Sequence, residues 1–148
     1  MLTPTSFLLS ALFSFTATFG FAVLYNVPRK ALLPCSAIGM GAYLVRTCLQ
    51  AWGASPSVAI FFGALFLGTV GAIPAKWMQL PIVLFVITGI IPIVPGTAVY
   101  RTIVFFYEGD VLGGLTNGIE AGFGIGAIAA GIGAGRILTD PEWGFERN

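Results

Sequence analysis

Long apolar segments, each close to the length that crosses a bilayer, follow one another along almost the whole chain. Because about 20 apolar residues in a helix span the hydrocarbon core, this pattern predicts an all-α integral membrane protein with a single transmembrane domain over residues 1–148. Five spans are expected, at about residues 6–25, 31–51, 57–73, 77–104 and 115–138.

Charge is too scarce for a soluble fold. Charged residues make up 9% of the chain, against roughly 25% in soluble domains. The sequence has no histidine, which excludes imidazole metal sites and histidine-activated nucleophiles. It also has no basic cluster that would neutralise phosphates. We therefore expect no enzymatic activity, metal, cofactor or nucleic-acid partner.

The fourth apolar segment contains a helix-breaking element. Pro92, Pro95 and Gly96 lie within five residues of one another. A proline inside a helix lacks the N–H group and clashes with the preceding turn. The span is therefore predicted to break near residues 92–96, and Thr97 is expected to cap a new helix.

The residues around this break are the predicted substrate-binding residues. Irregular backbone at membrane depth survives only where protein or a watery cavity covers it, and transporters use such broken helices to hold substrates. A restarted helix directs free N–H groups into the break, where they favour an anion. The candidate residues are Pro95, Gly96, Thr97, Tyr100 and Arg101.

Arg46 is a further candidate for substrate binding and has two interpretations. A guanidinium costs roughly 2.5–3.5 kcal/mol at the centre of a spanning helix, so its presence needs a reason. It either extends to the membrane interface near Trp52, or it faces the interior of the bundle and balances an anion. The sequence alone leaves both interpretations open.

Small residues recur at every fourth position in two spans, which is typical of closely packed membrane helices. In the first span they are Ser6, Ser10, Ser14, Thr18 and Ala22. In the fifth span they are Gly114, Gly118, Gly122, Gly126, Ala130 and Ala134, and the glycines are the predicted helix-packing residues.

Two groups of acidic residues differ in their expected roles. Glu120, with Asn117 on the same face, is a candidate for proton coupling or for pairing with an arginine, because ionisable groups inside spans are usually functional. The alternative for Glu120 is a carboxylate favoured by the dipole of a helix start. Glu108 and Asp110 are most simply an interfacial stop, although a coupling role for them stays open.

The positive charges predict the topology. Arg29 and Lys30 follow the first span, Lys76 follows the third, and Arg136 and Arg147 follow the fifth. Because positively charged loops stay in the cytoplasm, we expect the N-terminus outside and the C-terminus in the cytoplasm. This assignment requires the fourth segment to cross the membrane and not to re-enter.

Several motifs resemble the threonine/serine exporter family. They are residues 19–29 (FGFAVLYNVPR), 39–41 (GMG), 94–101 (VPGTAVYR) and 109–110 (GD). The chain looks like the C-terminal membrane half of that family, which occurs fused to a larger membrane module or as a separate small subunit, as in the split exporters associated with succinate. The resemblance implies a larger membrane partner subunit.

Together these inferences suggest a subunit of a secondary exporter in the cytoplasmic membrane of a bacterium. Its expected substrate is a small carboxylate, either threonine or serine or a C4-dicarboxylate such as succinate. The alternative is a structural subunit that assembles or stabilises a transporting partner. A channel-forming homo-oligomer also stays open.

Overall fold

The computed structural model describes residues 4–139, and over this range the all-α prediction is confirmed. The helices are α1 (Pro4–Leu24), α2 (Arg29–Ala51), α3 (Pro56–Val70), α4 (Ala72–Met78), α5 (Ile82–Ile90), α6 (Gly96–Tyr107) and α7 (Val111–Thr139).

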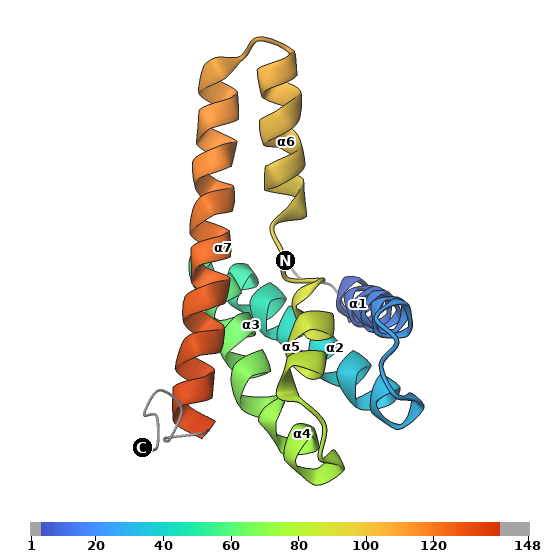
Figure 1. Ribbon diagram of the computed structural model, residues 1–148. Helices are drawn as coiled ribbons and strands as arrows, with labels where there is room; N and C mark the ends of the chain where they lie inside the picture. The colour runs from blue at the N-terminus through green and yellow to red at the C-terminus, as the bar shows by residue number, and fades with distance from the viewer. Residues whose placement is uncertain (1–3, 140–148) are drawn as a thin grey trace.

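Two parts of unlike shape make up the molecule (Figure 1). Helices α1 to α5 form a body beside the C-terminal half of α7, where α3 and α7 make the most extensive helix–helix contact. Helix α6 and the N-terminal half of α7 form an antiparallel hairpin that projects beyond this body. The segment between α5 and α6 is therefore the junction of the two parts.

Helix α1 packs through its small residues, as the spacing predicts. Ser14, Thr18 and Ala22 are buried, and the Thr18 hydroxyl donates to the Ser14 carbonyl within the helix. A Cβ built on Gly39 of α2 would lie 3.1 Å from the Cα of Gly89 in α5. Only glycine allows α1, α2 and α5 to approach this closely.

The third span is longer than expected. The third span was expected to end at residue 73, but Pro74 and Trp77 lie in α4, which continues from α3 through Gly71 in the right-handed helical conformation. Pro74 is tolerated because it lies in the first turn of α4, where its missing N–H has no helical partner in any case. The connection comes later, where Gln79 adopts a left-handed conformation with φ of 51°.

Backbone contact between α3 and α7 depends on glycine. A Cβ on Gly131 would lie 2.5 Å from the Phe61 carbonyl oxygen, and a Cβ on Gly135 would lie 2.9 Å from the Gly68 Cα. A third glycine, Gly124, packs against Pro95, with 2.9 Å from a built Cβ to Pro95 Cγ. Glycine in a helix costs about 1 kcal/mol relative to alanine, and close packing in lipid offsets that cost.

Four helices of the described range are long and apolar enough to cross a membrane, where five were expected. They are Thr5–Leu24, Arg29–Ala51, Pro56–Met78 and Val111–Thr139. The expected span at residues 77–104 is not one long helix, because α5 has 9 residues and α6 has 12. The prolines that separate them explain why neither reaches spanning length.

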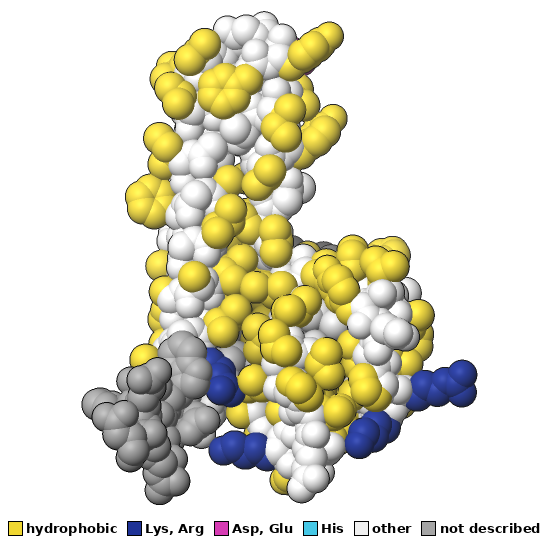
Figure 2. Space-filling model, viewed as in Figure 1, with side chains coloured by type: hydrophobic (Ala, Val, Ile, Leu, Met, Phe, Trp, Pro, Cys, Tyr) yellow, Lys and Arg dark blue, Asp and Glu magenta, His cyan; other side chains and the backbone are white. Residues whose placement is uncertain are grey.

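Basic side chains gather at one end of the body, which lies lowest in Figure 2. Lys30, at the start of α2, donates to the carbonyl of Met78 at the end of α4, with 3.2 Å between the atoms. Lys76 donates to the carbonyl of Thr139, the last residue of α7, at 3.3 Å. These contacts bring two of the predicted positive loops and the end of α7 together, while Arg147 lies outside the described residues.

Candidate functional site

The segment between α5 and α6 is irregular over residues 91–95. Ile93 and Pro95 are buried within it, Ile91 and Pro92 are half-buried and Val94 is exposed, so protein covers part of this non-helical backbone. The N-cap of α6 is Pro95, and no side chain caps the helix. The prediction that Thr97 is the N-cap is therefore wrong: the N-cap lies two residues earlier, at Pro95, and Thr97 is exposed in the first turn.

Arg46 reaches this segment from α2. Its Nη1 atom donates to the carbonyl oxygen of Ile93 at 3.1 Å and more weakly to that of Pro92 at 3.4 Å. Carbonyls near the end of α5 have lost helical partners because of the interruption, and the guanidinium satisfies two of them. The structure thus places the Arg46 guanidinium against the break.

The opposite edge of the same guanidinium has no partner within residues 4–139. Nε of Arg46 is buried and unpaired, and the hydrogen bonds of the side chain come from Nη1 alone. A guanidinium binds a carboxylate best with two parallel N–H groups. The Nε and Nη2 edge of Arg46 carries such a pair of donors, of which Nε is enclosed by the surrounding protein.

A cavity of about 270 Å³ lies next to this arrangement, between α1, α2 and the break. The residues that line it are Ser10, Phe13, Ser14, Ala17, Tyr43 and Pro92. Pro92 belongs both to the cavity lining and to the contact with Arg46, because its carbonyl accepts the hydrogen bond from Arg46 Nη1. Tyr43 and Arg46 are three residues apart on α2 and therefore lie on neighbouring positions of one helix face.

Contacts between α6 and α7 fix which residues of the hairpin face each other. A Cβ on Gly118 would lie 3.3 Å from Thr102 Cγ2, so these two residues are opposite each other. Nearer the tip of the hairpin, a Cβ on Gly113 of α7 would lie 3.1 Å from the ring of Phe105 in α6. The α6 face through Phe105 therefore adjoins the α7 face through Gly113.

The candidate site residues of the hairpin lie on these two adjoining faces of α6 and α7. Arg101 is four residues before Phe105, while Asn117 and Glu120 follow Gly113 at four and seven residues, so each lies on the adjoining face. Arg101 and Glu120 also lie at nearly the same height, one on each helix. Both are exposed, and they form no ion pair in the described part of the chain.

The other site predictions fall in different places. Tyr100 is 68% exposed on α6. Gly96 is exposed at the start of α6, and no atom lies within 4 Å of a Cβ built there. Pro95 is buried against Gly124 of α7. The structure therefore brings Arg46 to the break and gathers Arg101, Asn117 and Glu120 on the hairpin.

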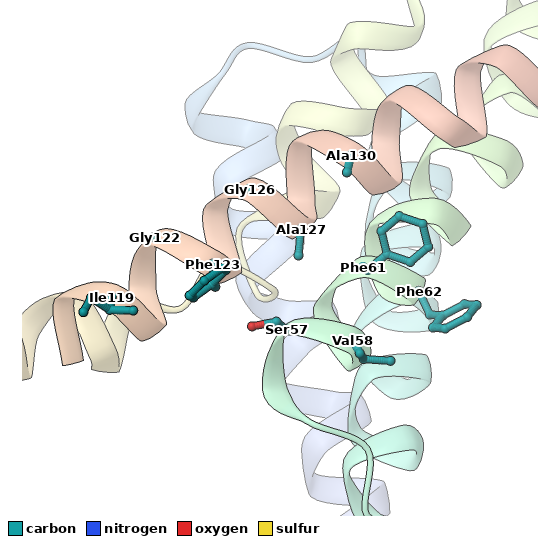
Figure 3. Close-up of a pocket in the computed structure, with 10 residues that line it drawn as sticks. All are labelled: Ser57, Val58, Phe61, Phe62, Ile119, Gly122, Phe123, Gly126, Ala127 and Ala130. Atoms are coloured by element: carbon teal, nitrogen blue, oxygen red, sulfur yellow. The ribbon is translucent and has the colours of Figure 1, made fainter. Parts of the chain in front are cut away.

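The four predicted packing glycines of α7 divide into two pairs. Gly114 and Gly118 face α6, whereas Cβ atoms built on Gly122 and Gly126 meet no atom within 4 Å. The second pair lies in an open groove of about 710 Å³ between α3 and α7 (Figure 3). Its lining is apolar apart from Ser57 and includes Phe61, Phe62, Ile119 and Phe123.

Sequence reasoning missed the lining of the cavity beside the break. Ser10 and Ser14 were explained by their spacing as packing residues, and Ser14 is indeed buried. Tyr43 carried a usable signal, because it stands three residues before a charged residue inside an apolar span. Nothing in the sequence showed that α1 would close over Pro92.

Comparison with known proteins identifies the family to which the chain belongs. No solved structure matches the fold. The sequence matches the family described as Threonine/Serine exporter, ThrE, over residues 10–137. This range includes the break at residues 91–95 and the hairpin of α6 and the N-terminal half of α7. The chain belongs to this family of membrane transport proteins.

Proposed function

We propose that the chain is a membrane subunit of a secondary exporter that binds the carboxylate of its substrate at the break between α5 and α6. The substrate class is a small carboxylate: threonine or serine, or a C4-dicarboxylate such as succinate. The exporter works in the cytoplasmic membrane of a bacterium together with a larger membrane subunit.

The unpaired edge of Arg46 is the observation that carries this proposal. An arginine with a buried, unpartnered Nε costs free energy unless another group pairs with it. Its Nη1 atom is fixed on the Ile93 carbonyl at 3.1 Å, which orients the remaining donors. A substrate carboxylate would complete the hydrogen bonding of a charge that the surrounding protein leaves incomplete.

We further propose that α5 and α6 together cross the membrane as the fourth of five crossings. At 1.5 Å per residue, the 9 residues of α5 and the 12 of α6 measure about 14 and 18 Å. Their sum is close to the hydrocarbon thickness of about 30 Å, so the break would lie near the middle. With five crossings, Lys30 and Lys76 face the cytoplasm, the N-terminus is outside and the C-terminus is inside.

The hairpin supplies the proposed coupling group and a second cation. Glu120 is nine residues into α7, about 14 Å below the start of the helix by the same rise per residue. Exposed apolar residues such as Leu112 and Leu115 lie between, which is consistent with a position inside the bilayer. We propose that Glu120, assisted by Asn117, carries the coupling proton and that Arg101 with Thr97 and Tyr100 guides the carboxylate toward the break.

A second candidate function, assembly of the partner, is favoured by one observation. Gly122 and Gly126 lie in an open groove and not in a helix contact of this chain. Stripes of small residues allow another membrane helix to approach closely. In this alternative the chain stabilises the larger subunit, and the partner alone transports the substrate.

Efflux from preloaded cells tests the proposal. Cells would carry this chain, the larger membrane subunit, or both, and the release of threonine, serine and succinate would be compared. Export that requires both chains and falls in Arg46→Gln supports substrate binding by this chain. Full export by the larger subunit alone, or by the pair with Arg46→Gln at normal abundance, would leave only the assembly role.

A further inference from the structure

A pocket of about 200 Å³ lies at the end of the body where the basic side chains gather (Figure 2). Lys76 of α4 and Arg136 of α7 both line it. The rest of its wall is apolar and consists of Ala72, Ala75, Leu80 and Ile82. The pocket therefore combines two cations, from helices far apart in the sequence, with an apolar surface.

Both cations stand on packed parts of the structure. Helix α4 continues from α3, and Gly135, the residue before Arg136, packs against Gly68 of α3. Lys76 uses one of its N–H donors on the carbonyl of Thr139 at 3.3 Å and keeps the others. An arginine carries more donors than one partner uses, so Arg136 can bind a ligand and keep another partner.

The pocket lies at the level expected for lipid headgroups. The candidate spans Pro56–Met78 and Val111–Thr139 end within one helical turn of Lys76 and Arg136, respectively. Trp77, next to Lys76, is 84% exposed, and tryptophan is enriched at the membrane–water interface. A ligand of this pocket would therefore come from the headgroup layer or from the adjacent water.

The distribution of charge favours an anion over a zwitterion. The acidic residues within residues 4–139 are Glu108, Asp110 and Glu120, and all of them lie in the hairpin and not beside the pocket. An ammonium group would find none of these carboxylates there, whereas a phosphate would meet Lys76 and Arg136. Arginine binds a phosphate through two parallel N–H groups, and lysine binds it as a point charge.

Apolar neighbours favour a lipid over a free phosphate. Leu80 and Ile82 belong to the wall of the pocket, and Ile137 and Leu138, next to Arg136, are 58% and 69% exposed. Contact with acyl chains removes such side chains from water. At about 200 Å³ the pocket is smaller than the roughly 300–1,000 Å³ of sites for drug-sized ligands. It would thus hold a phosphate and leave the acyl chains outside.

We propose that Lys76 and Arg136 form a binding site for the phosphate of an anionic phospholipid. The phosphate lies between α4 and α7, and the acyl chains extend along the exposed apolar side chains beside the pocket. Basic pockets between membrane helices bind anionic lipid headgroups in this way. The inference does not depend on the substrate or on the exporter role of the chain.

Lipid binding by the purified full chain in a neutral detergent tests the site. Native mass spectrometry would give dissociation constants for phosphatidylglycerol, which is anionic, and for phosphatidylethanolamine, whose phosphate is accompanied by an ammonium group. We expect the wild type to bind phosphatidylglycerol more tightly. Lys76→Gln and Arg136→Gln should each weaken this binding by about tenfold or more, as for the loss of one hydrogen bond to a charged group.

Arg29→Gln is the matched control for both variants. It removes one positive charge from the same end of the body, since its neighbour Lys30 donates to the Met78 carbonyl at the end of α4. Arg29 is exposed and does not line the pocket. We expect its dissociation constant for phosphatidylglycerol to stay within about twofold of the wild-type value, because isolated exposed charges contribute little. Circular dichroism would check that every variant is folded.

The outcomes decide between this site and its alternatives. A preference for phosphatidylglycerol that falls in Lys76→Gln and Arg136→Gln but not in Arg29→Gln supports the site. Unchanged binding in the first two variants, or equal binding of the two lipids by the wild type, would overturn it. An equal loss in Arg29→Gln would overturn it in favour of diffuse surface charge. Inorganic phosphate that displaces the lipid at equal concentration would overturn it in favour of a soluble anion.

Discussion

The body and the hairpin bury their helices in different ways. In the body, α3 and α7 touch backbone to backbone, and large side chains such as Phe85 and Leu67 are fully buried. In the hairpin, α6 has one residue, Ala98, that is buried, and Tyr107 is 92% exposed. The body therefore has a packed core of its own, whereas the hairpin leaves most of its surface to lipid or to another protein.

From this difference we propose separate tasks for the two parts. The body holds Arg46 and the cavity in fixed positions, as a binding site requires. The hairpin carries Arg101 and Glu120 on one exposed side, where a membrane protein tolerates charges only beside protein, water or each other. Binding is thus expected to depend on the body, and coupling and assembly on the hairpin.

The largest effect is expected from a bulky residue in the α3–α7 contact. Gly131→Leu would drive a side chain into the Phe61 carbonyl and Ala64, and overpacking of this kind typically costs about 1–3 kcal/mol or more. Thermal unfolding of the purified chain in detergent should show a marked loss of stability.

Gly126→Leu, on the same helix, is the matched comparison. No atom lies within 4 Å of a Cβ built at Gly126, so the isolated chain should unfold at the wild-type temperature. Equal destabilisation by both substitutions would show that the body does not pack through this glycine face. Loss of co-purification with the larger subunit in Gly126→Leu alone would place the partner in the groove of Figure 3.

An intermediate effect is expected from the charged side of the hairpin. Arg101→Ala should lower export about tenfold, as for the loss of one charge-assisted hydrogen bond, and Glu120→Gln should remove the dependence of export on the proton gradient. Neither should change the stability of the isolated chain by more than about 0.5 kcal/mol, because both residues are exposed.

Glu108→Gln, at the tip of the hairpin, is the control for the two variants. Its side chain is exposed at the C-cap of α6, and we expect export to stay at the wild-type rate. Export that responds to the proton gradient in Glu120→Gln would assign coupling to another group.

The smallest effect is expected at Thr97. No side chain caps α6, so Thr97→Val removes no capping bond and should leave the stability of the chain unchanged within about 0.5 kcal/mol. Export should fall by less than twofold, since the proposed carboxylate ligand is Arg46 and not Thr97. A loss as large as that of Arg101→Ala would restore Thr97 to the centre of the site.

The sequence predicted the fold well where local signals decide it. Apolar segments separated by turns gave the long helices, and the prolines of residues 92–95 lie where α5 and α6 separate. The third connection was misplaced, because the third span was expected to end at residue 73, whereas Pro74 lies in α4; a proline in a first helical turn is compatible with the helix.

The site was harder to predict because it depends on which helices meet. Arg46 had two interpretations until the position of residues 92–93 beside α2 was known. The regular spacing of glycines in α7 suggested one continuous packing face, yet α6 and α3 approach the helix from different directions. Gly118 therefore contacts α6, Gly131 contacts α3, and Gly122 contacts neither.

Threonine efflux by the exporter with Arg46→Gln and Arg46→Lys tests most directly whether this chain binds the substrate carboxylate at the break. We expect Arg46→Gln to lower efflux about 10- to 100-fold, since a bond to a charged group is worth about 1.5–3 kcal/mol. Arg46→Lys should restore only part of it, because lysine keeps the charge but loses the paired N–H groups. Wild-type efflux by Arg46→Gln, at normal abundance and with the larger subunit bound, would contradict the account.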